Sequence, residues 1–161
     1  MKPLHTYLRF PALILFLLFL AACSESENHA TKSATIASLD VYKSRTCQCC
    51  QQWVHHMEDV GFDTETHHPS DLNRIKNDYG ITPEFQSCHT AVSSDGYVFE
   101  GHIPARFVQQ FLENPPDDAI GLSVPGMPAG SPGMEMGDRK DHYKVILFNE
   151  AGQTRIFSEH N

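Results

Sequence analysis

The segment TCQCC, residues 46–50, constrains this chain more than any other feature. It places three cysteines in four positions, while only two other cysteines occur in the 161 residues. Cys47 and Cys50 form a CxxC pair on one side of a helix, whereas Cys49 is turned by about 100° from Cys50. One disulfide uses two of these sulfurs, so the third requires a different role, and metal binding provides one.

A strand and a helix are predicted around this motif. SLDVYKS has the partial alternation of a short strand, and the apolar spacing in CQCCQQWVHHMEDVGF predicts a helix that begins at the cysteines and ends at Gly61. The first helical turn offers unpaired backbone N–H groups and the positive end of the helix dipole, and both stabilise a thiolate. The position favours redox chemistry and metal binding alike.

The next elements continue an α/β pattern. In order, they are a strand in FDTETHH, a helix in PSDLNRIKNDYGI, two hairpin strands in TAV and YVFEG, and a helix in IPARFVQQFLEN. In the helix PSDLNRIKNDYGI, Leu72, Ile75 and Tyr79 share the predicted buried face. The resulting order, β-α-β-α-β-β-α, is typical of a thioredoxin-like domain, with a central mixed sheet flanked by helices.

The last third of the chain departs from that pattern. GLSVPGMPAGSPGMEMGDRKDHY is rich in Gly, Pro and Met and is too long for a simple connection, which predicts a functional loop. KVILFNEAGQTRIF then predicts a C-terminal hairpin that extends the edge of the sheet. We expect the loop to fold back beside Cys88 and the start of the CxxC helix.

The N-terminal residues 1–22 have the pattern of a lipoprotein signal peptide. Basic residues precede the apolar run PALILFLLFL, and LAAC resembles a lipobox in which Cys23 becomes acylated. A plain signal peptide or an uncleaved membrane helix is the alternative, although the run is short for a span. Residues 23–36 are polar and predict a flexible tether, which leaves residues 37–161 as one domain.

These features predict a location and exclude one class of partner. A lipid anchor would hold the domain at a membrane without a spanning helix, facing the periplasm, and Ser24 favours the outer membrane. Two of the 12 Lys and Arg lie within residues 1–22 and all 20 Asp and Glu follow, so the remaining chain carries a net charge of −10. Such a chain is not expected to bind nucleic acid.

Cys88 is the fourth cysteine of the predicted domain. It stands before the third predicted strand, where thioredoxin-like folds bring a loop, usually with a cis-proline, against the CxxC motif. Cys88 and His89 occupy that place, so four sulfurs can converge. Thiolates select Cu(I), Zn(II) or iron–sulfur clusters. Zinc fits four cysteines in a tetrahedron, whereas the crowded CQCC favours bridging thiolates and more than one copper ion.

The chain resembles the CopG-type periplasmic copper-resistance proteins, a thioredoxin-like family long known as a domain of unknown function. The resemblance spans about residues 39–150 and rests on VYKSRTCQCCQQWVHHM, GITPEFQSCHTAV, YVFEGHIPA and GLSVPGMPAGSPGMEMGDRKDHYKVILF. It implies copper bound at Cys47, Cys49, Cys50 and Cys88, and a role in copper handling or redox conversion. The lipobox departs from the many members that look freely soluble.

Other soft or basic side chains are candidates for secondary roles. His89 is expected to be a ligand or a hydrogen-bonding neighbour of the metal site. Met127 and Met134 offer thioethers for a copper gate or second site, or alternatively pack over Trp53. His102 either orients the CxxC helix or is exposed. The pairs His55–His56 and His67–His68 are weaker candidates, and the first is expected at the surface.

Two functions therefore remain open from the sequence. The first is a copper-binding protein that buffers, delivers or redox-converts copper, with periplasmic copper-handling proteins as partners. The second is a thiol–disulfide oxidoreductase that uses Cys47 as nucleophile and Cys50 as resolving thiol. Paired disulfides, Cys47–Cys50 and Cys49–Cys88, are the purely structural alternative. Cys49 favours copper, because a third thiol within reach would hinder exchange. Whether there is catalytic turnover is left open.

Overall fold

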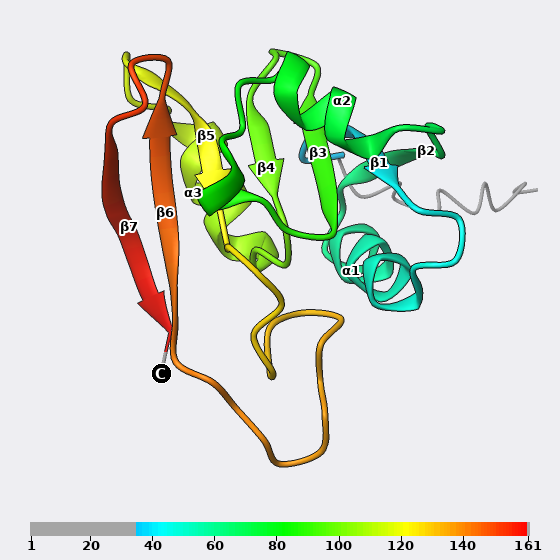
Figure 1. The fold of residues 1–161 in the computed structure, drawn as a ribbon. Helices are drawn as coiled ribbons and strands as arrows, with labels where there is room; N and C mark the ends of the chain where they lie inside the picture. The colour runs from blue at the N-terminus through cyan, green and yellow to red at the C-terminus, as the bar shows by residue number, and fades with distance from the viewer. Residues whose placement is uncertain (1–34, 161) are drawn as a thin grey trace, which may run out of the picture. The chain divides into compact units, whose positions relative to one another are not determined.

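The computed structural model describes residues 35–160, which form one mixed seven-stranded sheet with helices on its faces (Figure 1). The predicted signal peptide, Cys23 and nearly all of the tether lie outside these residues. In chain order the elements are β1 (Ser38–Lys43), α1 (Gln48–Asp59), β2 (Asp63–His67), α2 (Leu72–Asp78), the 3₁₀ helix η1 (Pro83–Phe85), β3 (His89–Ser93), β4 (Val98–Glu100), α3 (Ala105–Glu113), β5 (Ala119–Ser123), β6 (Tyr143–Asn149) and β7 (Thr154–His160).

The sheet confirms the predicted α/β class. Its strand order is β2-β1-β3-β4-β5-β6-β7. β1 runs parallel to β2 and antiparallel to β3, and β3 runs antiparallel to β4. The predicted order β-α-β-α-β-β-α is therefore present from β1 to α3, and the predicted C-terminal hairpin, β6 and β7, forms one edge of the sheet.

β5 is an element that the sequence analysis missed. Its residues AIGLS begin before the predicted loop and extend into it, and they pair in parallel with β4 and antiparallel with β6. Gly121 allows the strand to approach its neighbour, because a Cβ there would lie 1.7 Å from the carbonyl oxygen of Val98. The Gly- and Pro-rich loop is consequently residues 124–142, and it leaves and re-enters the sheet through adjacent strands.

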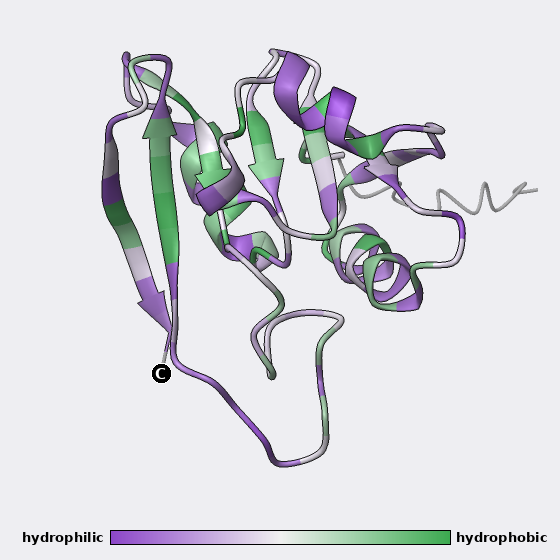
Figure 2. Ribbon diagram, viewed as in Figure 1, coloured by the Kyte–Doolittle hydropathy of each residue, from purple (hydrophilic) through white to green (hydrophobic). Residues whose placement is uncertain are grey.

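Hydrophobic side chains fill both faces of the sheet. One cluster joins Trp53 and Met57 of α1 and Phe111 of α3 to the strands, and it includes Val41 and Phe99. A second, smaller cluster, separate from the first, contains Ile81, Val98 and Phe148. Figure 2 shows hydrophobic residues along β4 and β6, which lie in the interior of the sheet.

The ends of the helices follow the sequence signals. Cys47 is the N-cap of α1, and the chain turns away at Gly61 with φ of 104°. Asp71 caps α2 by accepting the N–H of Arg74 at 3.1 Å. Within residues 35–160, no helix is both long and apolar enough to cross a membrane.

The buried face of α2 differs from the prediction. Leu72, Ile75 and Tyr79 are only partly buried, whereas the charged Lys76 is 2% exposed. Lys76 is buried because its ammonium group meets Glu100 of β4 inside the domain.

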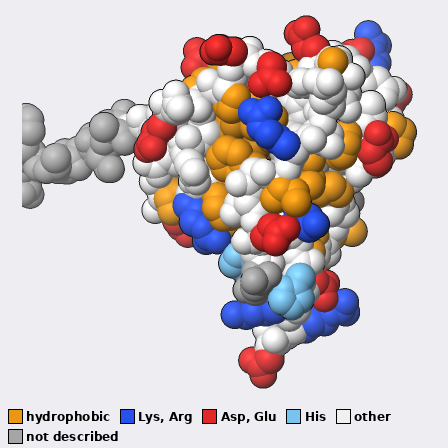
Figure 3. Space-filling model, turned by 90° about the vertical axis from the view of Figure 1, so that its left-hand side faces the viewer, with side chains coloured by type: hydrophobic (Ala, Val, Ile, Leu, Met, Phe, Trp, Pro, Cys, Tyr) orange, Lys and Arg blue, Asp and Glu red, His pale blue; other side chains and the backbone are white. Residues whose placement is uncertain are grey.

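Figure 3 shows the β7 side of the molecule, where hydrophobic side chains lie among charged ones and His and basic side chains appear toward the lower end.

Candidate metal centre

The start of α1 brings three sulfurs together. Cys47 and Cys50 form a disulfide with a Cα–Cα distance of 5.4 Å. The Sγ of Cys47 accepts the backbone N–H of Cys50 at 3.3 Å, as expected for a sulfur at a helix N-cap. Cys49 is a free thiol whose Sγ lies 3.4 Å from that of Cys47. Lys43 adds positive charge nearby, because its Nζ donates to the carbonyl oxygen of Cys47 at 3.4 Å.

Cys88 joins this group from the loop before β3. Its Sγ lies 3.3 Å from the Sγ of Cys50. All four sulfurs fall within 4.8 Å of one another, so the structure brings together the four predicted metal ligands. The alternative of two disulfides is met only in part, because Cys49 and Cys88 are both free.

His102 is the functional candidate that the sequence analysis undervalued. It is fully buried, and its Nε2 lies 2.9 Å from the Sγ of Cys88. Its Nδ1 lies 2.8 Å from the carbonyl oxygen of Pro132, which can only accept a hydrogen bond. The proton of the neutral ring is therefore on Nδ1, and the lone pair of Nε2 faces the sulfur. This is the orientation that metal-ligating histidines adopt.

The observed register of the β3–β4 hairpin accounts for the contact between His102 and Cys88. Thr90 pairs with Glu100 across β3 and β4, and continuing this antiparallel register outward places Cys88 opposite His102. The predicted strands TAV and YVFEG on either side of SSDG would pair Val92 with Tyr97, one residue away from the observed pairing of Val92 with Val98, so this register could not be counted from the predicted turn. We expected His102 either to be exposed or to orient the CxxC helix. In the structure it is buried beside the fourth cysteine, Cys88.

His89 lies next to the same sulfur. Its Nδ1 is 3.5 Å from the Sγ of Cys88, and its ring packs against Trp53 with centroids 4.5 Å apart. The side chain is fully buried, and among the described residues its Nε2 has no hydrogen-bond partner. Burial, followed by the charge of His102, sets the pKa of His89 well below its usual value, so the ring is neutral.

Burial also controls the protonation of the neighbouring groups. It raises the pKa of the Cys88 thiol to about 12, with a further increase from the charge of Cys49. It lowers the pKa of His102. Without a metal, the centre therefore holds a protonated Cys88 beside neutral imidazoles. A metal ion that binds here has to displace the thiol proton.

The Gly- and Pro-rich loop folds back over the start of α1, as the sequence analysis expected. A Cβ at Gly133 would lie 2.5 Å from the carbonyl oxygen of Cys49 and 2.9 Å from the backbone N of Trp53, so the loop backbone touches the helix. The contact between Pro132 and His102 fastens the same segment. The loop therefore forms one wall of the cysteine site.

The two candidate methionines of this loop, Met127 and Met134, differ in exposure. Met127 is 53% exposed and lines a hollow with Pro128, Tyr143 and Ile146, which contains no cysteine. Met134 is partly buried, and its backbone closes a turn with Ser131 at 2.8 Å. A role for either thioether in binding copper stays a prediction.

Only one member of the pair His55–His56 lies at the surface. His55 is exposed, but His56 is partly buried, and its Nε2 accepts the backbone N–H of Ala105 at 3.1 Å. That bond satisfies an N–H group at the start of α3, where Pro104 as N-cap provides no side-chain acceptor. The expectation that His56 is a surface residue was wrong, because α1 and α3 pack on the same face of the sheet.

The fold and the sulfur cluster define a class: small α/β proteins with a group of four cysteines, at the start of a helix, that could hold a soft metal ion. Comparison with known proteins narrows this class. Residues 85–134 match a family model described as a protein of unknown function, DUF411. No curated protein sequence matched.

Two solved structures match over nearly their whole length. One is titled copper resistance protein CopG, form 2, with 39% identity and a TM-score of 0.74, covering 78% of this chain and 98% of that one. The other is form 1 of copper resistance protein CopG, with 40% identity and a TM-score of 0.73, covering 77% and 97%. The chain belongs to the CopG family of copper resistance proteins, as the sequence resemblance predicted.

Proposed function

We propose that this protein binds copper in the cell envelope through the thiolates of Cys47, Cys49, Cys50 and Cys88. The observation that carries the proposal is the convergence of four sulfurs within 4.8 Å, with the Nε2 lone pair of His102 facing one of them. Thiolate and imidazole are ligands that suit Cu(I) and Zn(II). The copper-resistance titles of the matched structures favour copper over zinc.

The disulfide determines when all four sulfurs are available. Reduction of Cys47–Cys50 takes two electrons and two protons and yields two thiols, which then lose their protons when they bind metal. In the opposite direction, two thiols can each give one electron to a Cu(II) ion. The products are two Cu(I) ions, two protons and one disulfide. The same sulfurs can therefore serve copper buffering or copper redox conversion.

Metal analysis combined with thiol titration tests this function. Protein isolated from copper-supplemented cells should contain more than one copper per chain, with few titratable thiols until the metal is removed. Cys88→Ser should lower the copper content, and His55→Ala, which changes an exposed residue of α1, should leave it unchanged. Tight binding of one zinc per chain, without copper uptake in competition, would contradict the proposal.

Thiol–disulfide exchange is the second candidate function. The disulfide Cys47–Cys50 at the start of α1 favours it, because helix N-termini stabilise the leaving thiolate. Insulin reduction by the metal-free protein, compared with Cys47→Ser, measures this activity. Strong reductase activity combined with no retained copper would make exchange the main function.

The location is proposed from the N-terminal sequence. Basic residues, the run PALILFLLFL and the lipobox LAAC support acylation at Cys23 and a periplasm-facing domain. Fatty-acid labelling of the wild type and of Cys23→Ala, followed by membrane fractionation, tests both points. Labelling that persists in Cys23→Ala would rule out this anchor.

A further inference from the structure

The only ion pair that is buried within residues 35–160 joins α2 to β4. Lys76 Nζ lies 2.5 Å from Glu100 Oε1, and the two side chains are 3% and 0% exposed. The side chains of the other ion pairs in this part of the chain are at least 34% exposed. Burial of two charges is costly, and an apolar pair of similar volume often stabilises a fold at least as well. The pair therefore needs an explanation beyond stability.

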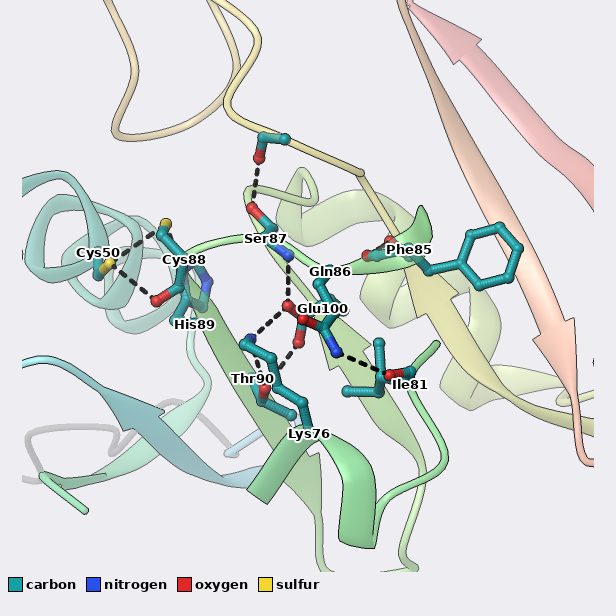
Figure 4. Close-up of polar contacts among 12 residues, drawn as sticks. Cys50, Lys76, Ile81, Phe85, Gln86, Ser87, Cys88, His89, Thr90 and Glu100 are labelled. Carbon is teal, nitrogen blue, oxygen red and sulfur yellow. Dashed lines mark hydrogen bonds and ion pairs between the residues drawn. The ribbon is translucent and has the colours of Figure 1, made fainter. Parts of the chain in front are cut away.

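The remaining hydrogen bonds of this pair lead to the loop that carries Cys88 (Figure 4). Oε1 of Glu100 accepts the backbone N–H of Ser87 at 2.6 Å. Oε2 accepts the hydroxyl of Thr90 at 2.6 Å, and that hydroxyl in turn accepts from Lys76 at 3.1 Å. One carboxylate thus holds the residue before Cys88 and the residue after His89.

The same carboxylate belongs to the segment that carries the other metal-site residue. Glu100 ends β4, two residues before His102, and Gly101 donates its N–H to the carbonyl oxygen of His89 at 3.0 Å. The backbone around Cys88 and the backbone before His102 are therefore both held by the carboxylate or the strand position of Glu100. Contacts near 3 Å between sulfur and its neighbours depend on backbone positions to within a fraction of an ångström.

We propose that Glu100, oriented by Lys76, is a positioning residue that holds the Ser87 N–H and so places the Cys88 sulfur against Cys50 and His102. Its relevance to copper rests on the proposed function. The positional effect itself concerns only the protein and can be measured without metal. The charge of Lys76 keeps the carboxylate oriented, and the acceptor oxygen of Glu100 does the positioning.

Two double variants separate the acceptor from the charge. Lys76→Met with Glu100→Gln, the Gln variant, removes both charges and retains an oxygen for the Ser87 N–H. Lys76→Met with Glu100→Leu, the Leu variant, removes both charges and the acceptor. Neither leaves a buried unpaired charge, so both are expected to fold. The exposed pair Arg74–Asp78 on the same helix supplies the control, Arg74→Met with Asp78→Leu.

The first readout is alkylation of Cys88 in the metal-free full chain, followed by mass spectrometry of its peptide. The Leu variant should react about tenfold faster than the Gln variant, the ratio expected for loss of a hydrogen bond to a polar acceptor. The Gln variant and the exposed-pair control should react like the wild type. Equal rates in the Gln and Leu variants would overturn the positioning role.

The second readout is copper per chain in the same four proteins and in Cys88→Ser. A lower copper content in the Leu variant alone supports the positioning role at the metal site. If alkylation differs but copper binding is the same in every protein, including Cys88→Ser, the proposed copper ligands are wrong while the positioning of Cys88 stands. If Cys88→Ser loses copper but the Gln and Leu variants match in both readouts, the proposed function stands and the positioning role is wrong.

Discussion

Cys88 and His102 face each other where the β3–β4 hairpin opens, with Sγ and Nε2 2.9 Å apart. Because Nδ1 of His102 is held by Pro132, the ring cannot turn its lone pair away from the sulfur without losing that bond. A sulfur from one end of the hairpin and a nitrogen from the other therefore form a pair of donors that the loop of residues 124–142 keeps in place.

Replacement of His102 tests this pair. His102→Phe retains a buried ring but removes both nitrogens, so copper should remain partly bound with an affinity about 10- to 100-fold lower. Competition with a coloured Cu(I) chelator measures the change, and His55→Phe serves as the exposed control on α1. An affinity equal to that of the wild type would limit His102 to packing.

Cys49 tests whether the third sulfur of TCQCC binds metal. Cys49→Ser should lower copper stoichiometry or affinity, because the Sγ that lies 3.4 Å from Cys47 is removed. The Cys47–Cys50 disulfide should still form, since Cys49 is not part of it. Metal analysis and thiol counting give both results. Unchanged copper with improved insulin reduction would favour the exchange enzyme instead.

The loop methionines allow a test that leaves the cysteines intact. Met127→Leu combined with Met134→Leu retains apolar bulk and removes both thioethers, so the domain should fold with an unchanged unfolding midpoint. If the thioethers bind copper, the copper content or its redox midpoint should shift. Metal analysis and voltammetry report these quantities. No shift in either would reduce the two side chains to packing or surface roles.

His56 should make stability depend on pH. Burial lowers its pKa below 6.5, so the unfolded chain binds more protons than the folded chain between the two values. Its stabilising bond to Ala105 is fully present above pH 6.5 and weakens as the pH falls through the lower, folded-state pKa. His56→Ala should cost about 1 kcal/mol above pH 6.5, as for other caps.

Urea unfolding of the wild type and His56→Ala across this pH range gives the measurement. The difference in the free energy of unfolding between the two proteins should shrink as the pH falls. Comparison of the two proteins cancels the titration of the other histidines. A difference that stays constant with pH would show that His56 does not cap α3 through its neutral ring.

Gly133 should be sensitive to a single added carbon. Gly133→Ala places a Cβ against the carbonyl oxygen of Cys49, so the loop has to move away from α1. We expect a loss of roughly 1–3 kcal/mol in the free energy of unfolding from this overlap, and a lower copper content. Gly137→Ala is the matched control, because Gly137 also has a positive φ but nothing lies within 4 Å. Equal effects would trace the loss to the backbone angle alone.

Local signals were sufficient for the start of the site. The apolar spacing after TCQCC predicts α1, and the helix period places Cys47 and Cys50 together, so three of the four sulfurs follow from one segment. The position of Cys88 depends on the strand pairing of an ordinary hairpin, which the SSDG turn indicates. The contact with His102 did not follow from that turn, because the predicted strands pair Val92 with Tyr97, whereas the structure pairs Val92 with Val98.

The parts that were missed depend on contacts between distant segments. Lys76 reads as a surface residue of an amphipathic helix, and only Glu100, 24 positions later, explains its burial. β5 is five residues long and contains Gly121, which weakens any strand signal, and it exists because β4 and β6 lie on either side of it. Neither feature leaves a periodic pattern in its own segment.

The insertion of β5 between β4 and β6 gives the loop over the cysteines two anchored ends. Residues 124–142 leave β5 and return through its antiparallel neighbour β6, so both ends of this loop are held by the sheet. Attachment at both ends restricts the space that the loop can explore, and it keeps Pro132 and Gly133 at a high effective concentration near α1. The wall that this loop forms beside the cysteines is thus held in place from the sheet at both of its ends.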